Sequence, residues 1–179
     1  GVLEYIFEPA DDYSQWKWVT RMARLAASKY EADWVINADA DEFWFPHQGS
    51  LKDALAKIPK DISVVGVKRN NFVTVNRKHK HFYMDMLYRE KVSLNSMDEP
   101  LPGKVCHRAF KNVVVRQGNH YIAQPENLQV ANKSEIEILH FPVRSFPQFE
   151  NKIKLGGAAI QRNNELDKKK EIIILLAKQ

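Results

Sequence analysis

A dense group of acidic residues directly after a short apolar run is the feature that most constrains this chain. Residues 34–36, Trp-Val-Ile, have the composition of a buried strand, and Asp39, Asp41 and Glu42 follow closely. Two like charges about 4 Å apart repel by about 1 kcal/mol in water, and by more in a lower dielectric. Because ligands of α/β sheets bind outside the carboxyl ends of strands, we expect these carboxylates to bind a cation or a polar ligand.

The residues around the acids favour a bound cation over a solvated acidic turn, which is the alternative. The strand before them and Phe43-Trp44-Phe45 after them place the carboxylates against a partly buried wall, where unpaired acids are costly. Aspartates two residues apart can both reach one ion, and oxygen ligands favour Mg²⁺ or Mn²⁺ over softer metals. One of these ions is therefore the expected cofactor.

Length, charge and cysteine content set wider limits. The 179 residues predict a single domain over residues 1–179, and the net charge of +5 favours anionic partners such as nucleotides, nucleic acid or acidic lipids. The longest apolar run, residues 172–177, is too short for a membrane helix, and the start lacks the pattern of a signal peptide. Cys106 is the single cysteine, which excludes an internal disulfide and a thiolate zinc cluster. We expect a cytoplasmic protein. Residues 168–176 are basic at first and then apolar, and a weak contact of this segment with a lipid surface would make the protein peripheral to a membrane.

Helix and strand patterns alternate along the chain and predict an α/β fold. Apolar residues recur at helical spacing from Trp16 to Tyr30, after a fair N-cap at Ser14. Ser50 and Asp53 form a capping-box-like start for a second helix. The other expected elements are strands over residues 3–7, 62–67, 82–88 and 136–141, a hairpin of residues 105–110 with 113–115, a helix beginning at Ser145, and a last helix over residues 165–178.

Four blocks of this sequence resemble the family 2-like glycosyltransferases. Residues 30–43, which end in Asn-Ala-Asp-Ala-Asp-Glu-Phe, resemble the D-x-D-E-F segment of that family, and the helix containing Trp16 fits the pattern before it. The family normally begins with a strand and loop that hold the nucleotide base, and few residues precede the helix here, so we expect an N-terminally incomplete domain. Three blocks similar to later parts of the family follow in the same order, at residues 103–108, 118–120 and 139–145, so that the resemblance extends over residues 13–157.

The resemblance implies a GT-A fold, in which a mixed, mostly parallel sheet lies between helices. It also implies a nucleotide-sugar donor, a saccharide or lipid-linked acceptor, and Mn²⁺ or Mg²⁺ as cofactor. By this analogy Asp41 binds the metal that bridges the diphosphate, and Asp39 lies near the donor ribose or sugar and shares the metal site. Glu42 is expected to support the turn or to position the metal-binding residues.

The other parts of a transferase site are a clamp for the leaving diphosphate and, in inverting enzymes, a base for the acceptor hydroxyl. His140, at the end of an expected strand, is a further candidate for metal binding, and Arg144 has the planar donor fork that suits phosphate. Arg108, which follows His107, and His120, which follows a glycine, are further candidates for donor binding.

Three carboxylates are candidates for the base, and the sequence does not separate them. Asp98 and Glu99 lie in an expected loop over residues 95–103. Asp85 lies in the expected strand over residues 82–88.

Two other functions compete with glycosyl transfer. Haloacid-dehalogenase-like phosphatases also place D-x-D at a strand end, but a small hydroxyl residue and a glycine usually follow, whereas Glu42-Phe43 follow here. A basic nucleic-acid-binding domain explains the net charge but not the acidic cluster, which repels phosphate unless it is loaded with metal. The preferred hypothesis therefore predicts no nucleic-acid partner. The cations that the nucleic-acid hypothesis would use are Lys68, Arg69, Arg77, Lys78 and Lys80.

Overall fold

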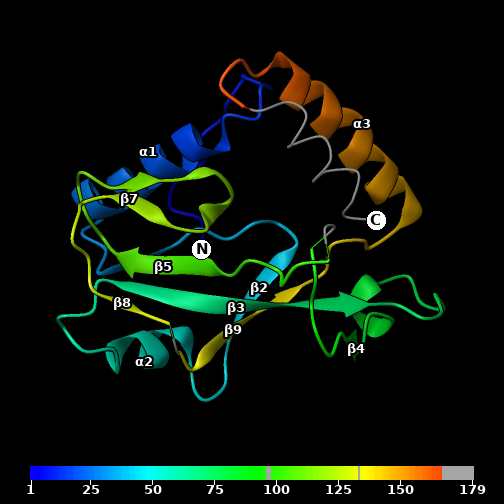
Figure 1. Cartoon of the computed structure of the whole chain (residues 1–179), viewed down its shortest axis with the longest axis horizontal. Helices are drawn as coiled ribbons and strands as arrows, with labels where there is room; N and C mark the ends of the chain where they lie inside the picture. The colour runs from blue at the N-terminus through cyan, green and yellow to red at the C-terminus, as the bar shows by residue number, and fades with distance from the viewer. Residues whose placement is uncertain (96–97, 133, 167–179) are drawn as a thin grey trace.

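The computed structural model describes residues 1–95, 98–132 and 134–166. Within these ranges the protein is a mixed α/β structure, in which a curled sheet has helices on both of its faces (Figure 1). The expected α/β class is confirmed.

A seven-stranded sheet forms the centre of the described structure, with the order β1-β5-β3-β9-β2 and with β4 and β8 also paired to β3. The pairs of β3 with β8 and β9 are parallel, and the other pairs in this sheet are antiparallel. The expectation of a mostly parallel sheet is therefore wrong. Parallel neighbours need long crossovers, usually helical, and the described part of residues 57–145 contains no α-helix. The strands are β1 (Trp34–Ile36), β2 (Glu42–Pro46), β3 (Val64–Val73), β4 (Tyr88–Arg89), β5 (Lys104–Arg108), β8 (Val130–Ala131) and β9 (Ile136–His140).

Helix α1 (Gln15–Ser28) covers one face of the sheet and confirms the first expected helix. Ser14 is its N-cap residue, although the Ser14 side chain makes no capping hydrogen bond. The helix packs on a two-stranded ribbon of β6 (Val114–Val115) and β7 (Ile122–Gln124), which lies on the same side of the sheet (Figure 1). A hydroxyl contact fixes this packing, because Val115 N donates to Thr20 Oγ1 at 3.0 Å.

Helix α2 (Leu51–Ala56) covers the opposite face and begins at the expected capping box. Asp53 N donates to Ser50 Oγ at 3.2 Å, and Ser50 N donates to Asp53 Oδ2 at 3.0 Å. The main core lies beneath α2, with Trp34 and Ile36 of β1 packed against it, whereas Val35 points toward α1. The buried members of this core are Trp44, Ala54, Val65, Val67, Cys106, Ile136 and Ile138.

Two strand predictions in the middle of the chain are wrong. Residues 105–110 and 113–115 do not form a hairpin, because β5 is a buried central strand between β1 and β3, and β6 pairs with β7 instead. Residues 82–88 form a 3₁₀ turn, η1 (Phe82–Met84), before the short β4. The alternation of apolar and polar residues here does not reflect a strand. Phe82, for example, is apolar because its ring packs edge-on against Phe141, with 5.2 Å between ring centroids.

Both ends of the described chain differ from the expected elements. Residues 3–7 form no strand and are mostly exposed. At the other end β9 leads into α3 (Phe146–Arg162), where Ser145 caps the helix by accepting a hydrogen bond from Gln148 N at 3.1 Å. Most of the last expected helix, and the apolar segment of residues 168–176, lie outside the described residues. Among the helices described here, none combines the length and the apolar character that crossing a membrane requires.

Candidate functional site

The acidic cluster lies in a tight turn that joins β1 to the edge strand β2. Glu42 N donates to Asp39 O at 3.1 Å, which closes the turn, and Phe141 N donates to Asp41 O at 2.9 Å. Glu42 is the cross-strand partner of His140 in the antiparallel pair of β2 and β9. The backbone therefore brings a histidine from the C-terminal part of the chain to the acids.

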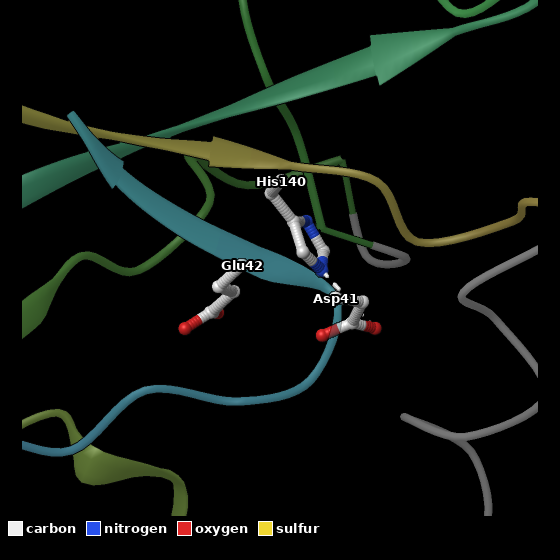
Figure 2. Close-up of side chains that lie close together, drawn as sticks. All are labelled: Asp41, Glu42 and His140. Atoms are coloured by element: carbon white, nitrogen blue, oxygen red, sulfur yellow. Dashed lines mark ion pairs between the residues drawn. The ribbon is translucent and has the colours of Figure 1, made fainter. Parts of the chain in front are cut away.

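Asp41, Glu42 and His140 form the group of ligand atoms that could hold a metal. Each offers one atom, and the three atoms lie within 4.8 Å of one another. Figure 2 shows the His140 ring directed from β9 toward Asp41, with Nε2 3.8 Å from Asp41 Oδ2. Glu42, expected to support the turn or to position the metal-binding residues, belongs to this group, whereas Asp39, expected to share the metal, does not.

Asp41 is paired with a lysine of the C-terminal helix. Lys152 Nζ of α3 lies 3.1 Å from Asp41 Oδ2. Burial alone would raise the pKa of Asp41, but the contact with His140 and the positive charge of Lys152 outweigh burial and hold this pKa well below its usual range. Asp41 is thus an anion at neutral pH, and its present counter-ion belongs to the chain.

Asp39 is held by a lysine at the start of β5. Lys104 Nζ lies 2.5 Å from Asp39 Oδ2, although the lysine side chain is only 2% exposed. Gln15 Nε2 of α1 donates to Asp39 Oδ1 at 3.0 Å. Gly103 permits this arrangement, since a Cβ there would lie 2.6 Å from Val67 O on β3. The close approach of the two strands brings Lys104 into the sheet beside the acidic turn.

Glu42 is the most deeply buried of the three acids. Arg69 of β3 donates from Nη1 to Glu42 Oε1 at 3.1 Å, and Lys104 Nζ lies 3.4 Å from the same oxygen. The second oxygen, Oε2, is buried and has no hydrogen-bond partner among the described residues. A buried carboxylate oxygen without a partner is costly, which is an observation that points to a ligand.

His140 is oriented from its other side by two residues of neighbouring strands. Its Nδ1 lies 2.7 Å from Asn71 Oδ1, and Asn71 Nδ2 donates to Glu90 Oε2 at 2.9 Å. Burial lowers the pKa of His140, which favours the neutral form of the ring. A metal-binding histidine usually has its other ring nitrogen held by a hydrogen bond to an oxygen acceptor, as Nδ1 is held here by Asn71 Oδ1.

A cleft of about 670 Å³ opens beside these groups. Its wall includes Asp39, Lys104, Arg69 and His140 from the cluster described above. The lining therefore combines positive and negative side chains with apolar residues such as Phe72 and Met86. A ligand with an anionic part and a less polar part fits this lining.

The structure brings some of the residues expected to bind the donor to the cleft and leaves others away from it. His120 lines the cleft, and its Nδ1 lies 2.6 Å from Gly103 O, next to Lys104. Arg144 lies over the Phe82 ring, with 5.6 Å from its guanidinium carbon to the ring centroid. Arg108 lies at the opposite end of β5 from Lys104, stacked over Trp34 at 4.3 Å. The structure therefore brings His120 to the cleft and does not bring Arg108 there.

The three carboxylates proposed as bases do not line this cleft. Asp85 stabilises the loop that precedes it in the sequence, because its carboxylate accepts hydrogen bonds from Lys78 N and His79 N. Glu99 is exposed and accepts from Asn95 Nδ2 at 3.1 Å, and Asp98 is exposed beside it. These three assignments remain predictions without support from the geometry.

Several cleft residues were missed in the sequence, and of Lys104, Asn71 and Glu90 only Lys104 had a weak signal. Lys104 adjoins the apolar Val105-Cys106, which is unusual for a solvated lysine. Asn71 and Glu90 had no signal, because their roles depend on the pairing of β3 with β4 and β9. Arg69, which the nucleic-acid hypothesis used, is buried against Glu42 and so is not available to a polyanion.

The donor set fits a divalent cation. Two carboxylates and one imidazole converge, and a buried carboxylate oxygen lacks a hydrogen-bond partner among the described residues. Carboxylate oxygen suits Mg²⁺ and Mn²⁺, and the imidazole shifts the preference away from Mg²⁺.

No family model matches this chain, and no curated protein matches it significantly.

Proposed function

We propose that this chain is a glycosyltransferase domain that binds a nucleotide-diphosphate sugar and a divalent cation at the turn between β1 and β2. The observation that carries this proposal is the convergence of Asp41, Glu42 and His140 beside a cleft that also contains Asp39. The D-x-D acids and a histidine from a distant block of the resembling sequence thus lie together.

The charges of the cleft support an anionic ligand bound through a cation. Asp39, Asp41 and Glu42 would repel a diphosphate by themselves, whereas a divalent ion held by Asp41 and His140 would attract it. Lys104 and Lys152 add positive charge next to the same acids. This pattern favours a metal–diphosphate complex over a free polyanion.

Breaking the bond between the anomeric carbon and the diphosphate places negative charge on the leaving group. When bound, the cation supplies Lewis-acid stabilisation of that charge. The chain itself would contribute the fixed ammonium of Lys104 and the ring of His120, both of which line the cleft. Asp39, held by Lys104 and Gln15, would accept hydrogen bonds from sugar hydroxyls.

Calorimetric titration of UDP and GDP, with and without Mn²⁺, tests the proposal. We expect binding that requires Mn²⁺ and is lost in Asp41→Asn, while the exposed Asp61→Asn serves as the matched control and binds as the original chain does. Metal-independent binding that survives in Asp41→Asn would contradict the assignment. Hydrolysis of a generic phosphate ester that Asp39→Asn abolishes would favour the phosphatase alternative instead.

A further inference from the structure

We infer that Asn71 and Glu90 are positioning residues that fix His140 in one tautomer, with the lone pair of Nε2 directed at Asp41. The inference rests on the proposed function, because the tautomer matters for the metal site that this function requires. The tautomer itself follows from the contacts of this chain alone.

The orientation of the Asn71 amide is fixed by its neighbour. A carboxylate can only accept hydrogen bonds, so the group 2.9 Å from Glu90 Oε2 is the NH₂ of Asn71. The carbonyl oxygen of the amide then faces His140, 2.7 Å from its Nδ1. An amide oxygen has no proton to donate, so Nδ1 of His140 carries the proton.

The proton on Nδ1 determines the state of the other ring nitrogen. A neutral imidazole has a single N–H, so whenever the ring is neutral with its proton on Nδ1, Nε2 presents the lone pair. Nε2 lies 3.8 Å from Asp41 Oδ2, which is longer than the ~3.2 Å limit of a good hydrogen bond. Two ligand atoms each about 2.1 Å from one ion can lie up to about 4.2 Å apart, so this spacing suits a shared cation.

The backbone holds both positioning residues in register with the histidine. Asn71 is the cross-strand partner of His140 in the parallel pair of β3 and β9. Asn71 N donates to Ser93 Oγ at 2.8 Å, and Glu90 N donates to Asn71 O at 3.0 Å. Asn71 and Glu90 are therefore joined twice, once through the backbone and once through side chains, which limits rotation of the amide.

Long-range ¹H–¹⁵N NMR of the metal-free chain tests the tautomer directly, with His140→Gln identifying the signals of His140. At a pH that keeps the ring neutral, we expect a protonated Nδ1 and an unprotonated Nε2 in the original chain. Glu90→Gln removes the fixed acceptor, lets the Asn71 amide reverse, and should shift His140 toward the Nε2–H tautomer. Glu99→Gln, which changes an exposed glutamate bonded to Asn95, is the matched control and should leave the tautomer unchanged.

Titration of Mn²⁺ followed by electron paramagnetic resonance tests the consequence for the site. Loss of the hydrogen bond that orients a metal-bound histidine typically weakens metal binding 10- to 100-fold, and we expect a loss of that size in Glu90→Gln and Asn71→Leu. Asn71→Asp keeps an acceptor for Nδ1–H and should restore the tautomer and part of the affinity.

An Nε2–H tautomer in the original chain, or variants that leave both tautomer and Mn²⁺ affinity unchanged, would overturn the inference. Its failure can be told apart from failure of the proposed function. If the original chain binds no Mn²⁺ but shows the expected tautomer and its loss in Glu90→Gln, the tautomer assignment is supported and the metal site of the proposed function is refuted.

Discussion

At the scale of single residues, Lys104 decides how the acidic turn can exist in a folded chain. In the sequence, acids without evident partners next to an apolar wall favour a bound metal. The structure shows that Lys104 contacts both Asp39 and Glu42, and that Arg69 also contacts Glu42. The chain therefore supplies its own counter-ions, so acids near an apolar wall do not by themselves establish a metal site.

Replacing Lys104 by methionine should strongly destabilise the protein. Removing one partner of a buried ion pair typically costs about 3–5 kcal/mol, because the remaining charge stays buried without compensation. Urea unfolding measures the loss, and Lys111→Met, at an exposed position, is the control and should change stability little. A loss below about 1 kcal/mol in Lys104→Met would contradict the role assigned to this lysine.

At the scale of elements, the strand–turn–helix unit of β9 and α3 determines what surrounds Asp41. His140 ends β9, Ser145 caps α3, and Lys152 lies two turns into that helix. The unit thus presents an imidazole and an ammonium to the same oxygen, Asp41 Oδ2. A divalent ion bound at this oxygen must compete with the ammonium of Lys152.

Replacing Lys152 by methionine should therefore strengthen metal binding. A partly exposed ion pair contributes at most about 1 kcal/mol, so we expect Mn²⁺ affinity to rise by up to roughly fivefold. Lys154→Met, on the same helix and paired only with Glu150 among the described contacts, is the control. Weaker Mn²⁺ binding in Lys152→Met, measured by calorimetry, would show that the lysine assists the site instead of competing for it.

Elements with their own local signals were predicted well, and elements defined by distant partners were not. The Ser50–Asp53 capping box and the apolar spacing of α1 depend on neighbouring residues, so both helices could be read from the sequence. The hairpin of residues 105–110 failed because β5 pairs with β1 and β3. For the same reason His140 and Asp41 were predictable as candidates, while Asn71 and Glu90 were not.

At the scale of the whole molecule, the sheet centre contains a histidine that makes folding sensitive to pH. His107 of β5 is fully buried, and its Nδ1 lies 2.8 Å from Arg108 O. Burial lowers the pKa of His107. Above about pH 6.5 the residue is neutral in both folded and unfolded chains, but below that value the unfolded chain takes up a proton first.

The free energy of unfolding should therefore fall as the pH drops below about 6.5, by up to about 1.4 kcal/mol per pH unit for His107. Urea unfolding between pH 7.5 and 5.5 measures this slope. His107→Gln cannot take up the proton and should show a shallower slope, whereas His81→Gln, at an exposed position, should not. An unchanged slope in His107→Gln would contradict the prediction.

The pairing of Glu42 with His140 also links ligand occupancy to the integrity of the sheet. β2 is the last strand in the order β1-β5-β3-β9-β2, so β9 is its only neighbour on that path. A ligand that coordinates residues from both strands would link the edge strand β2 to its neighbour β9. Occupancy of the site would then oppose local opening of this edge of the sheet.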